Sequence, residues 1–425
     1  MNNEKQRSLL KEAGLLFCRE PYRLFFPYAI LLGMIGVSHW LLYALGWIPN
    51  YSGFFHGSIQ MLGYMSCFIF GFLLTAMPRF IDAPRCSPQE LAAFFLLMTV
   101  IWVSLCTHHP VLAETSFILF LICFLRFIVK RIRIKQTEKH HDHPVRPPTE
   151  FVWIPVAVLH GLFGATLLIA GQLGWVSPRL LLVARLMLEQ GFLLCIVIGV
   201  GGFLGPRLMG WFRLLDPKQV QAVSQALAVR KRRITIHLFG GILIFLSFWL
   251  EGFERHLAAY LIRAAVVTLE FFWTGALPKW PRVPDFYAKL LWVSFWMVIL
   301  GHWLLVFLPH MRLIGLHVVF IGGYSLMTFS VATMVVLSHA GEAAQLKKPL
   351  LVLWVVAVFI TAALATRITA IFNAEHYFQF LAIAAGFWLV GGLGWLLFII
   401  PKVLKMPAGI DFEKMHEEAK RRVCE

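Results

Sequence analysis

The chain has 425 residues, of which 59% are hydrophobic and only 14% are charged, and its formal net charge is +16. Soluble domains usually carry about 25% charged residues, so most of this chain is expected to avoid water. The basic surplus does not indicate a nucleic-acid-binding protein, because the sequence contains no basic domain with base-stacking or groove-reading elements.

Apolar runs long enough to cross a bilayer, which takes about 20 residues, follow one another along the chain. Together they predict an all-α polytopic membrane helix bundle. The transmembrane domain covers residues 24–402, between a basic N-terminal segment 1–23 and a C-terminal tail 403–425. The first run exceeds the apolar region of a signal peptide, so a cleavable signal is not expected. About twelve spans are predicted, at 24–47, 56–77, 90–108, 111–130, 151–173, 180–204, 234–251, 257–277, 288–308, 313–338, 350–371 and 378–400.

The distribution of basic residues predicts how these spans are oriented. Lys and Arg concentrate in cytoplasmic loops. Of the 38 Lys and Arg, 32 lie in the two termini and the even-numbered connections, and only Arg179, Arg255 and Arg312 lie in the odd-numbered ones. Both termini are therefore predicted to be cytoplasmic, and the net charge is explained by short loops that face an anionic leaflet.

Three other features are interpreted as structural. The seven cysteines are scattered and form no CxxC pair, which is typical of packing residues. The polar stretch 130–150 contains HHDH at 140–143; a solvated loop is favoured there over a metal site. The ends of the second and sixth spans, GFLLTAMPR and GGFLGPRL, are similar, which a shared way of ending a helix would explain.

Histidines are frequent within the predicted spans and fall into two layers. Ionisable residues at membrane depth are functional candidates, and neutral imidazole is a good ligand for iron, copper and zinc. Hydrogen-bonded packing is the alternative interpretation. His317 and His339 are about 33 Å apart along one helix, so they cannot bind the same ion. The outer layer contains His39, His56, His302 and His317, and the inner layer contains His160, His237 and His339.

Several polar residues near these histidines are candidate cofactor-binding residues. Gln60 lies one turn after His56 and is predicted to hold the imidazole tautomer. Tyr324 follows His317 on the same stripe of the tenth span, beside the small pair Gly322–Gly323.

The arginines within the spans allow two interpretations. Arg185 is four residues from Glu189 and can pair with it. Arg263 shares a helix face with Glu270, and Arg367 has no obvious partner. Structural ion pairs are one interpretation; the other is that Arg185, Arg263 or Arg367 binds haem propionates.

Two blocks of the sequence resemble the hallmarks of the NnrS family. FHGSIQMLGYMSCFIFGFLLTAMPRF at 55–80 is similar to WHAHEMLFGFxxxxxxGFLLTAxPxW, and HVVFIGGYSLMTFSVATMVVLSHAGE at 317–342 is similar to HxxxxGxxGxMxxxVMxRVxLGHxGR. YRLFFP at 22–27 also resembles the family's FRPFF. Three positions depart from the pattern: Ser58 and Ile59 replace a family His and Glu, and Met334 replaces an Arg.

The resemblance implies a multi-pass protein of the bacterial cytoplasmic (inner) membrane that carries haem and copper and takes part in the nitric oxide response, with nitric oxide as a ligand. It implies His56, His317 and His339 as metal ligands. With Ser58 and Ile59 in place of the family residues, two alternatives are open: the protein carries haem alone, or His302 or His39 substitutes as a copper ligand.

Two other functions remain open at this stage. A secondary transporter of a small solute or metal ion would also use twelve spans with buried Arg and Glu. A structural assembly factor would use its buried polar groups only to fix helix packing. No nucleophile with its base is recognisable, so no enzymatic reaction is predicted.

Overall fold

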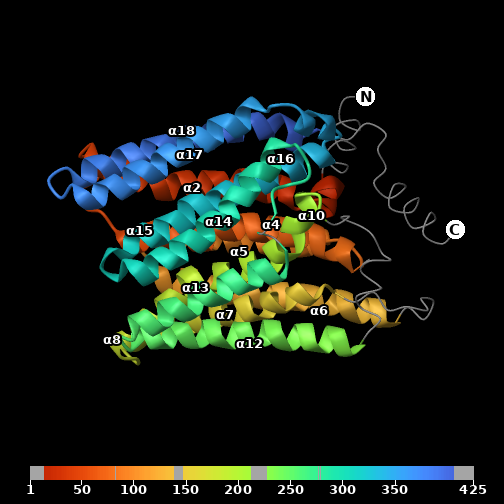
Figure 1. The fold of residues 1–425 in the computed structure, drawn as a ribbon, viewed down its shortest axis with the longest axis horizontal. Helices are drawn as coiled ribbons and strands as arrows, with labels where there is room; N and C mark the ends of the chain where they lie inside the picture. Colours follow the sequence, from red (N-terminus) through yellow and green to blue (C-terminus); the bar gives the residue numbers. More distant parts are fainter. Residues whose placement is uncertain are drawn as a thin grey trace. The chain divides into compact units, whose positions relative to one another are not determined.

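The chain folds as an all-helical membrane protein. The computed structural model describes residues 14–81, 83–137, 147–211, 227–275, 277 and 279–405. Within these ranges it contains helices and no strand, and twelve helices are long and apolar enough to cross a membrane (Figure 1). The predicted fold class and the twelve spans are therefore confirmed, and the sidedness of the termini stays a prediction.

The helices divide into two compact units. Unit 1 consists of Met1–Val200 and His237–Val266, and unit 2 of Gly201–Ile236 and Val267–Glu425, so the division falls within the sixth, seventh and eighth spans. The elements that lie wholly or partly in unit 1 are α2 Tyr22–Ala44, α3 Gly53–Ser58, η1 Ile59–Met65, α4 Ser66–Phe80, α5 Pro88–Cys106, α6 Pro110–Thr137, η2 Thr149–Val152, α7 Trp153–Gln172, α8 Pro178–Leu186, η3 Met187–Gly191, α9 Phe192–Ile196, η4 Val197–Gly201, α12 Leu227–Gly252 and α13 His256–Trp273.

Serine residues that act as N-caps begin two helices of unit 1. Ser87 caps α5, where its hydroxyl accepts from the Glu90 amide (3.2 Å) and the Glu90 carboxylate accepts from the Ser87 amide (2.9 Å). Ser177 caps α8 by accepting from the Leu180 amide (3.5 Å) and is followed by Pro178, which needs no hydrogen-bond acceptor in a first turn. These pairs explain why the predicted third and sixth spans start within a few residues of the observed helices.

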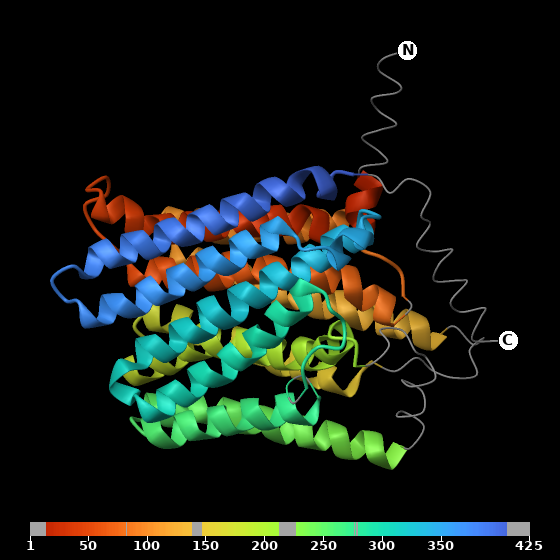
Figure 2. The same cartoon turned by 45° about the horizontal axis from the view of Figure 1, so that its top comes forward.

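Unit 2 contains the last four spans and the end of the sixth. α17 and α18 lie side by side as an antiparallel pair in both views (Figure 1, Figure 2). The elements that lie wholly in unit 2 are α10 Gly202–Leu208, α14 Phe286–Phe307, η5 Pro309–Met311, α15 Arg312–His317, η6 Val318–Ser325, α16 Leu326–His339, η7 Ala343–Lys347, α17 Leu351–Thr369, η8 Ala370–Phe372 and α18 Tyr377–Val403.

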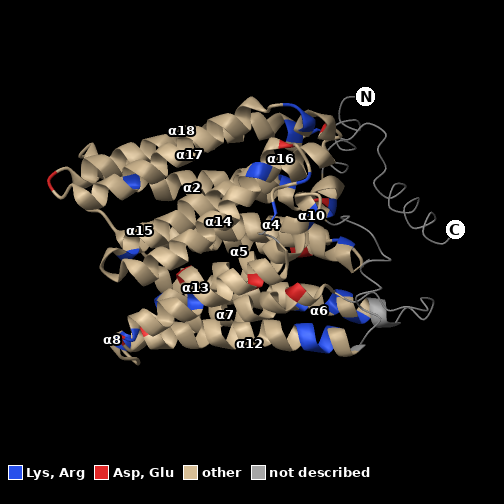
Figure 3. Ribbon diagram, in the orientation of Figure 1, with Lys and Arg blue, Asp and Glu red and all other residues tan. Residues whose placement is uncertain are grey.

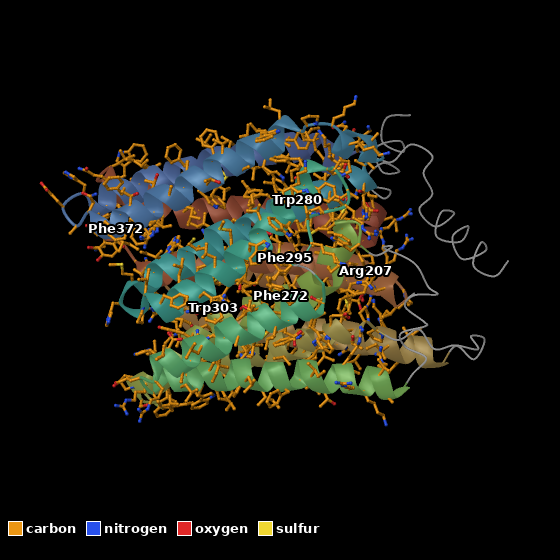
Figure 4. The ribbon with its side chains drawn as sticks, viewed as in Figure 1. Arg207, Phe272, Trp280, Phe295, Trp303 and Phe372 are labelled. Carbon is orange, nitrogen blue, oxygen red and sulfur yellow. The ribbon has the colours of Figure 1, made fainter. Side chains whose placement is uncertain are left out.

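Aromatic side chains fill the interior of unit 2. The ring of Phe295 meets that of Phe271 edge-on at 4.9 Å, and the Trp303 indole donates to the Thr268 hydroxyl (3.1 Å). Phe295 and Trp303 are labelled in Figure 4, where Phe372 and Arg207 lie toward opposite ends of this unit. Within unit 2 most Lys and Arg lie toward the Arg207 end (Figure 3), as expected for helices that run through a bilayer.

Three spans contain π-helical segments. η1 lies in the second span, η3 and η4 in the sixth, and η6 in the tenth, and these are also the three most buried spans within the described ranges. η1 and η3 begin at positions 59 and 187, 128 residues apart. The same offset aligns Gly63, Cys67, Gly71, Pro78 and Arg79 with Gly191, Cys195, Gly199, Pro206 and Arg207. Because π-helical segments concentrate at functional sites, these spans are the first places to look for one.

Candidate functional site

His56 lies in α3, at the start of the second span. Ser52 caps this helix by accepting from the Phe55 amide (3.1 Å). The His56 Nδ1–H donates to the carbonyl of Gly36 on α2 (2.9 Å), and the imidazole packs edge-on against Trp40 (5.5 Å). Donation from Nδ1 places the lone pair of a neutral ring on Nε2, which is the arrangement of metal-binding histidines.

Two predicted neighbours of His56 bind backbone instead. Gln60 donates to the Gly33 carbonyl (2.9 Å) and not to His56. The sequence suggested that Gln60 sets the His56 tautomer; the Gly36 carbonyl has that role. His39 accepts the Ser52 amide on Nε2 (2.7 Å), which occupies the nitrogen opposite Nδ1 with a donor. The Nε2 of His39 is therefore occupied by a backbone donor, which makes His39 poorly suited to be a metal ligand.

The π-helical segment η3 brings a carboxylate next to α3. Arg185 donates to Glu189 (2.8 Å), as the i, i+4 spacing predicted. A Cβ added at Gly57, the residue after His56, would lie 3.2 Å from the Glu189 carboxylate. The Arg185 guanidinium also lies 5.6 Å from the Phe54 ring centroid. An anion, a cation and an imidazole-bearing helix thus meet at one end of unit 1.

Arg263 belongs to a buried network in which Glu251 is its partner. The sequence paired Arg263 with Glu270 on the same helix; the guanidinium instead binds Glu251 of α12, and both side chains are almost fully buried. Tyr260 donates to the same carboxylate (3.2 Å), and Gln190 of η3 accepts from Arg263 (3.4 Å). The prediction of a Glu270 pair was wrong because it considered only residues on one helix.

The inner histidines of unit 1 are packed into the bundle. His160 is fully buried, donates from Nδ1 to the Val156 carbonyl (2.8 Å), and lies between the rings of Phe245 and Phe248. His237 accepts from the Trp153 indole at 3.4 Å. His160 touches Gly191 of η3, which leaves no room there for a larger side chain.

In unit 2 the predicted metal ligand His317 accepts a hydrogen bond from an arginine. Arg367 of α17 donates from Nε to the His317 Nε2 (3.2 Å) and from Nη2 to the Tyr377 hydroxyl (3.5 Å). His317 itself donates from Nδ1 to the Leu313 carbonyl (2.7 Å). The structure therefore brings together His317 and Arg367, which the sequence had assigned to different roles. His317, Arg367 and Tyr377 are called the Arg367 cluster below.

The other predicted residues of unit 2 are His302, His339 and Tyr324. His302 is buried and donates from Nδ1 to the Val298 carbonyl (2.8 Å), which again places the lone pair on Nε2. His339 is half-buried at the end of α16, and Tyr324 is buried in η6 with its ring 5.8 Å from that of Phe320.

Neither unit assembles a cluster of metal ligands. Among the described residues there is no group of three or more His, Cys, Asp or Glu side chains that could hold a metal ion. The HHDH sequence at 140–143 lies outside the described residues.

The family model for the NnrS protein matches residues 16–406. The chain belongs to the NnrS family. The two blocks that resemble NnrS hallmarks contain the π-helical segments η1 and η6. His56 lies at the start of the second span, and His317 lies in the tenth. No curated protein matches this NnrS chain.

Several residues of these sites had no sequence signal that singled them out. Glu251 ends an apolar span, Gln190 lies inside another, and Tyr377 begins the last span. A search for every acid or amide within a predicted span would have found Glu251 and Gln190, but their partner Arg263 becomes apparent only once α12, α13 and η3 are packed together.

Proposed function

We propose that this protein binds haem through His56 and takes part in the response to, or protection from, nitric oxide in the bacterial cytoplasmic membrane. The observation that carries the proposal is the hydrogen bond from His56 Nδ1 to the Gly36 carbonyl, in a chain that matches the NnrS family over residues 16–406. That bond fixes the ring orientation and places the lone pair on Nε2.

The residues around His56 fit haem better than copper. Trp40 packs against the His56 imidazole, and Phe55 packs against His39. Arg185, which lies over the Phe54 ring, supplies a cation for a propionate. Copper needs several His, Cys or Met ligands, and the described residues supply no group of three His, Cys, Asp or Glu. A haem iron with an open coordination position would bind nitric oxide directly. His56 would hold the iron, and the Gly36 carbonyl would hold His56.

Purified protein tests this proposal directly. Wild-type protein loaded with haem should show a Soret band that shifts on reduction and again on addition of nitric oxide. His56→Ala should lose most of the bound haem while it still inserts into the membrane, because its axial ligand is gone. His310→Ala, which changes an exposed histidine of η5, should retain full haem content.

Two results would contradict the proposal. Protein that stays colourless and iron-free after haem loading would overturn the proposal, and movement of a solute into liposomes by that protein would identify a transporter instead. Full haem content in His56→Ala would overturn the assignment of His56; the buried His302, whose lone pair is also on Nε2, would then be tested in the same way.

A further inference from the structure

Arg367 is a buried cation that has no carboxylate partner among the described residues. It is only 9% exposed, and its Nη1 is buried without a hydrogen-bond acceptor. Its two polar contacts, His317 and Tyr377, are both neutral: His317 donates from Nδ1 to a carbonyl, so the Nε2 that faces Arg367 carries a lone pair. Glu375, the acid nearest to it in sequence, is exposed and forms no ion pair with it.

The other buried arginines show what is missing. Three further arginines are buried in the described part of the chain, and each binds a carboxylate: Arg23 binds Glu20 (2.6 Å), Arg131 binds Glu90 (2.8 Å) and Arg263 binds Glu251. An uncompensated buried charge is strongly destabilising. Arg367 lies in the last turn of α17, where the helix dipole offsets only a small part of that cost.

The start of α18 adds to the positive potential. Tyr377 is the first residue of this 27-residue helix, which has no side-chain N-cap and no acidic residue in its first turn. The first amides of such a helix attract anions. Tyr377 accepts from Arg367, so its own hydroxyl hydrogen is available for a second acceptor.

We propose that the Arg367 cluster binds a carboxylate. Arg367 Nη1 and the Tyr377 hydroxyl donate to its oxygens, and His317 is a positioning residue that fixes the guanidinium by accepting from Nε. The carboxylate is a free monocarboxylate, and its binding does not depend on the haem proposal above.

Haem-free protein provides the first test. Arg367→Leu should raise the thermal unfolding temperature of the haem-free protein, because it removes a buried charge that lacks a partner. Acetate is the probe for the carboxylate. In a chloride-poor sulfonate buffer it should raise the unfolding temperature of the wild type and leave that of Arg367→Leu unchanged. Arg312→Leu, in the same unit, is the control and should respond to acetate as the wild type does. A lowered unfolding temperature of haem-free Arg367→Leu would show a structural role and overturn the proposal.

The positioning role of His317 provides the second test. His317→Ala should lose part of the acetate response with an unchanged Soret band, and His317→Gln, which retains an acceptor, should regain the response.

The outcomes separate the two proposals. Wild-type protein whose unfolding temperature does not respond to acetate overturns the carboxylate site and leaves the haem proposal standing. An acetate response in protein that never binds haem supports the carboxylate site and overturns the haem proposal. Loss of the Soret band in His317→Ala would make His317 an iron ligand and overturn its positioning role.

Discussion

At the scale of single residues, the molecule uses arginine in two different ways. Arg185 is half-exposed and pairs with Glu189 within one helix, whereas Arg263 is buried and binds Glu251 across two helices. Desolvation makes the two pairs respond differently to mutation. An exposed pair is worth about 1 kcal/mol or less, but a buried charge that loses its partner is left uncompensated.

We expect Glu251→Ala to lower the free energy of unfolding of detergent-solubilised protein by about 3–5 kcal/mol, because Arg263 and the Tyr260 hydroxyl both lose their acceptor. Glu189→Ala should cost about 1 kcal/mol or less. The double variant Glu251→Met, Arg263→Met should recover much of the loss. Additive losses in the double variant would mean that the two side chains are not energetically coupled.

What could be predicted at this scale depended on distance along the chain. The Arg185–Glu189 pair was predictable because residues four apart are neighbours on a helix. The contact between His317 and Arg367 joins residues that are 50 positions apart. No periodicity within either span indicates it, so His317 had been assigned to a metal alone.

At the scale of elements, the π-helical segment η3 matters most in unit 1. Its consecutive residues face three different neighbours: Glu189 approaches Gly57, Gln190 accepts from Arg263, and Gly191 meets His160. Adjacent residues of any helix point about 100° apart and so reach separate partners. The π-helical turn shifts the positions of these side chains relative to those of the flanking α-helical turns. Such a segment has no compositional signature, which is why apolar run length predicted the span and not its irregularity.

Gly191→Ala tests how tightly η3 is held. A Cβ at this position would collide with the His160 imidazole and the Phe248 ring, so we expect a loss of about 1–3 kcal/mol in the free energy of unfolding. Gly386→Ala in α18 is the matched control: no atom lies within 4 Å of its added Cβ, and the substitution should be neutral or stabilise by up to about 1 kcal/mol. Equal effects of the two substitutions in thermal unfolding would show that η3 tolerates a side chain there.

At the scale of the whole molecule, hydrocarbon thickness made the fold predictable. Each crossing needs a minimum apolar length and internally bonded backbone, so composition alone locates the helices. The spans predicted at 56–77 and 180–204 correspond to helices at Gly53–Phe80 and Pro178–Leu208. The candidate site could not be predicted as well, because it depends on which polar groups meet after the helices pack.

The sidedness of the twelve spans can be tested with the native cysteines. Cys106 is exposed at the end of α5, which the basic-residue pattern places at the outer face. Cys86 lies in the connection between α4 and α5, just before the opposite end of α5, on the predicted cytoplasmic side, and is buried. Burial, and then the nearby Glu90 carboxylate, raises the pKa of Cys86 from 9.0 to about 12, so it holds almost no thiolate at pH 8.

A membrane-impermeant maleimide added to intact cells at pH 8 should therefore label the protein at Cys106, and Cys106→Ser should abolish the signal. Cys86→Ser should leave labelling unchanged, both in intact cells and after the membrane is opened, because the thiol at 86 stays protonated and buried. Labelling of Cys106 only after the membrane is opened would reverse the predicted orientation and place both termini outside. Since 32 of the 38 basic residues lie on one predicted side, that result would make this chain an exception to the charge rule for membrane proteins.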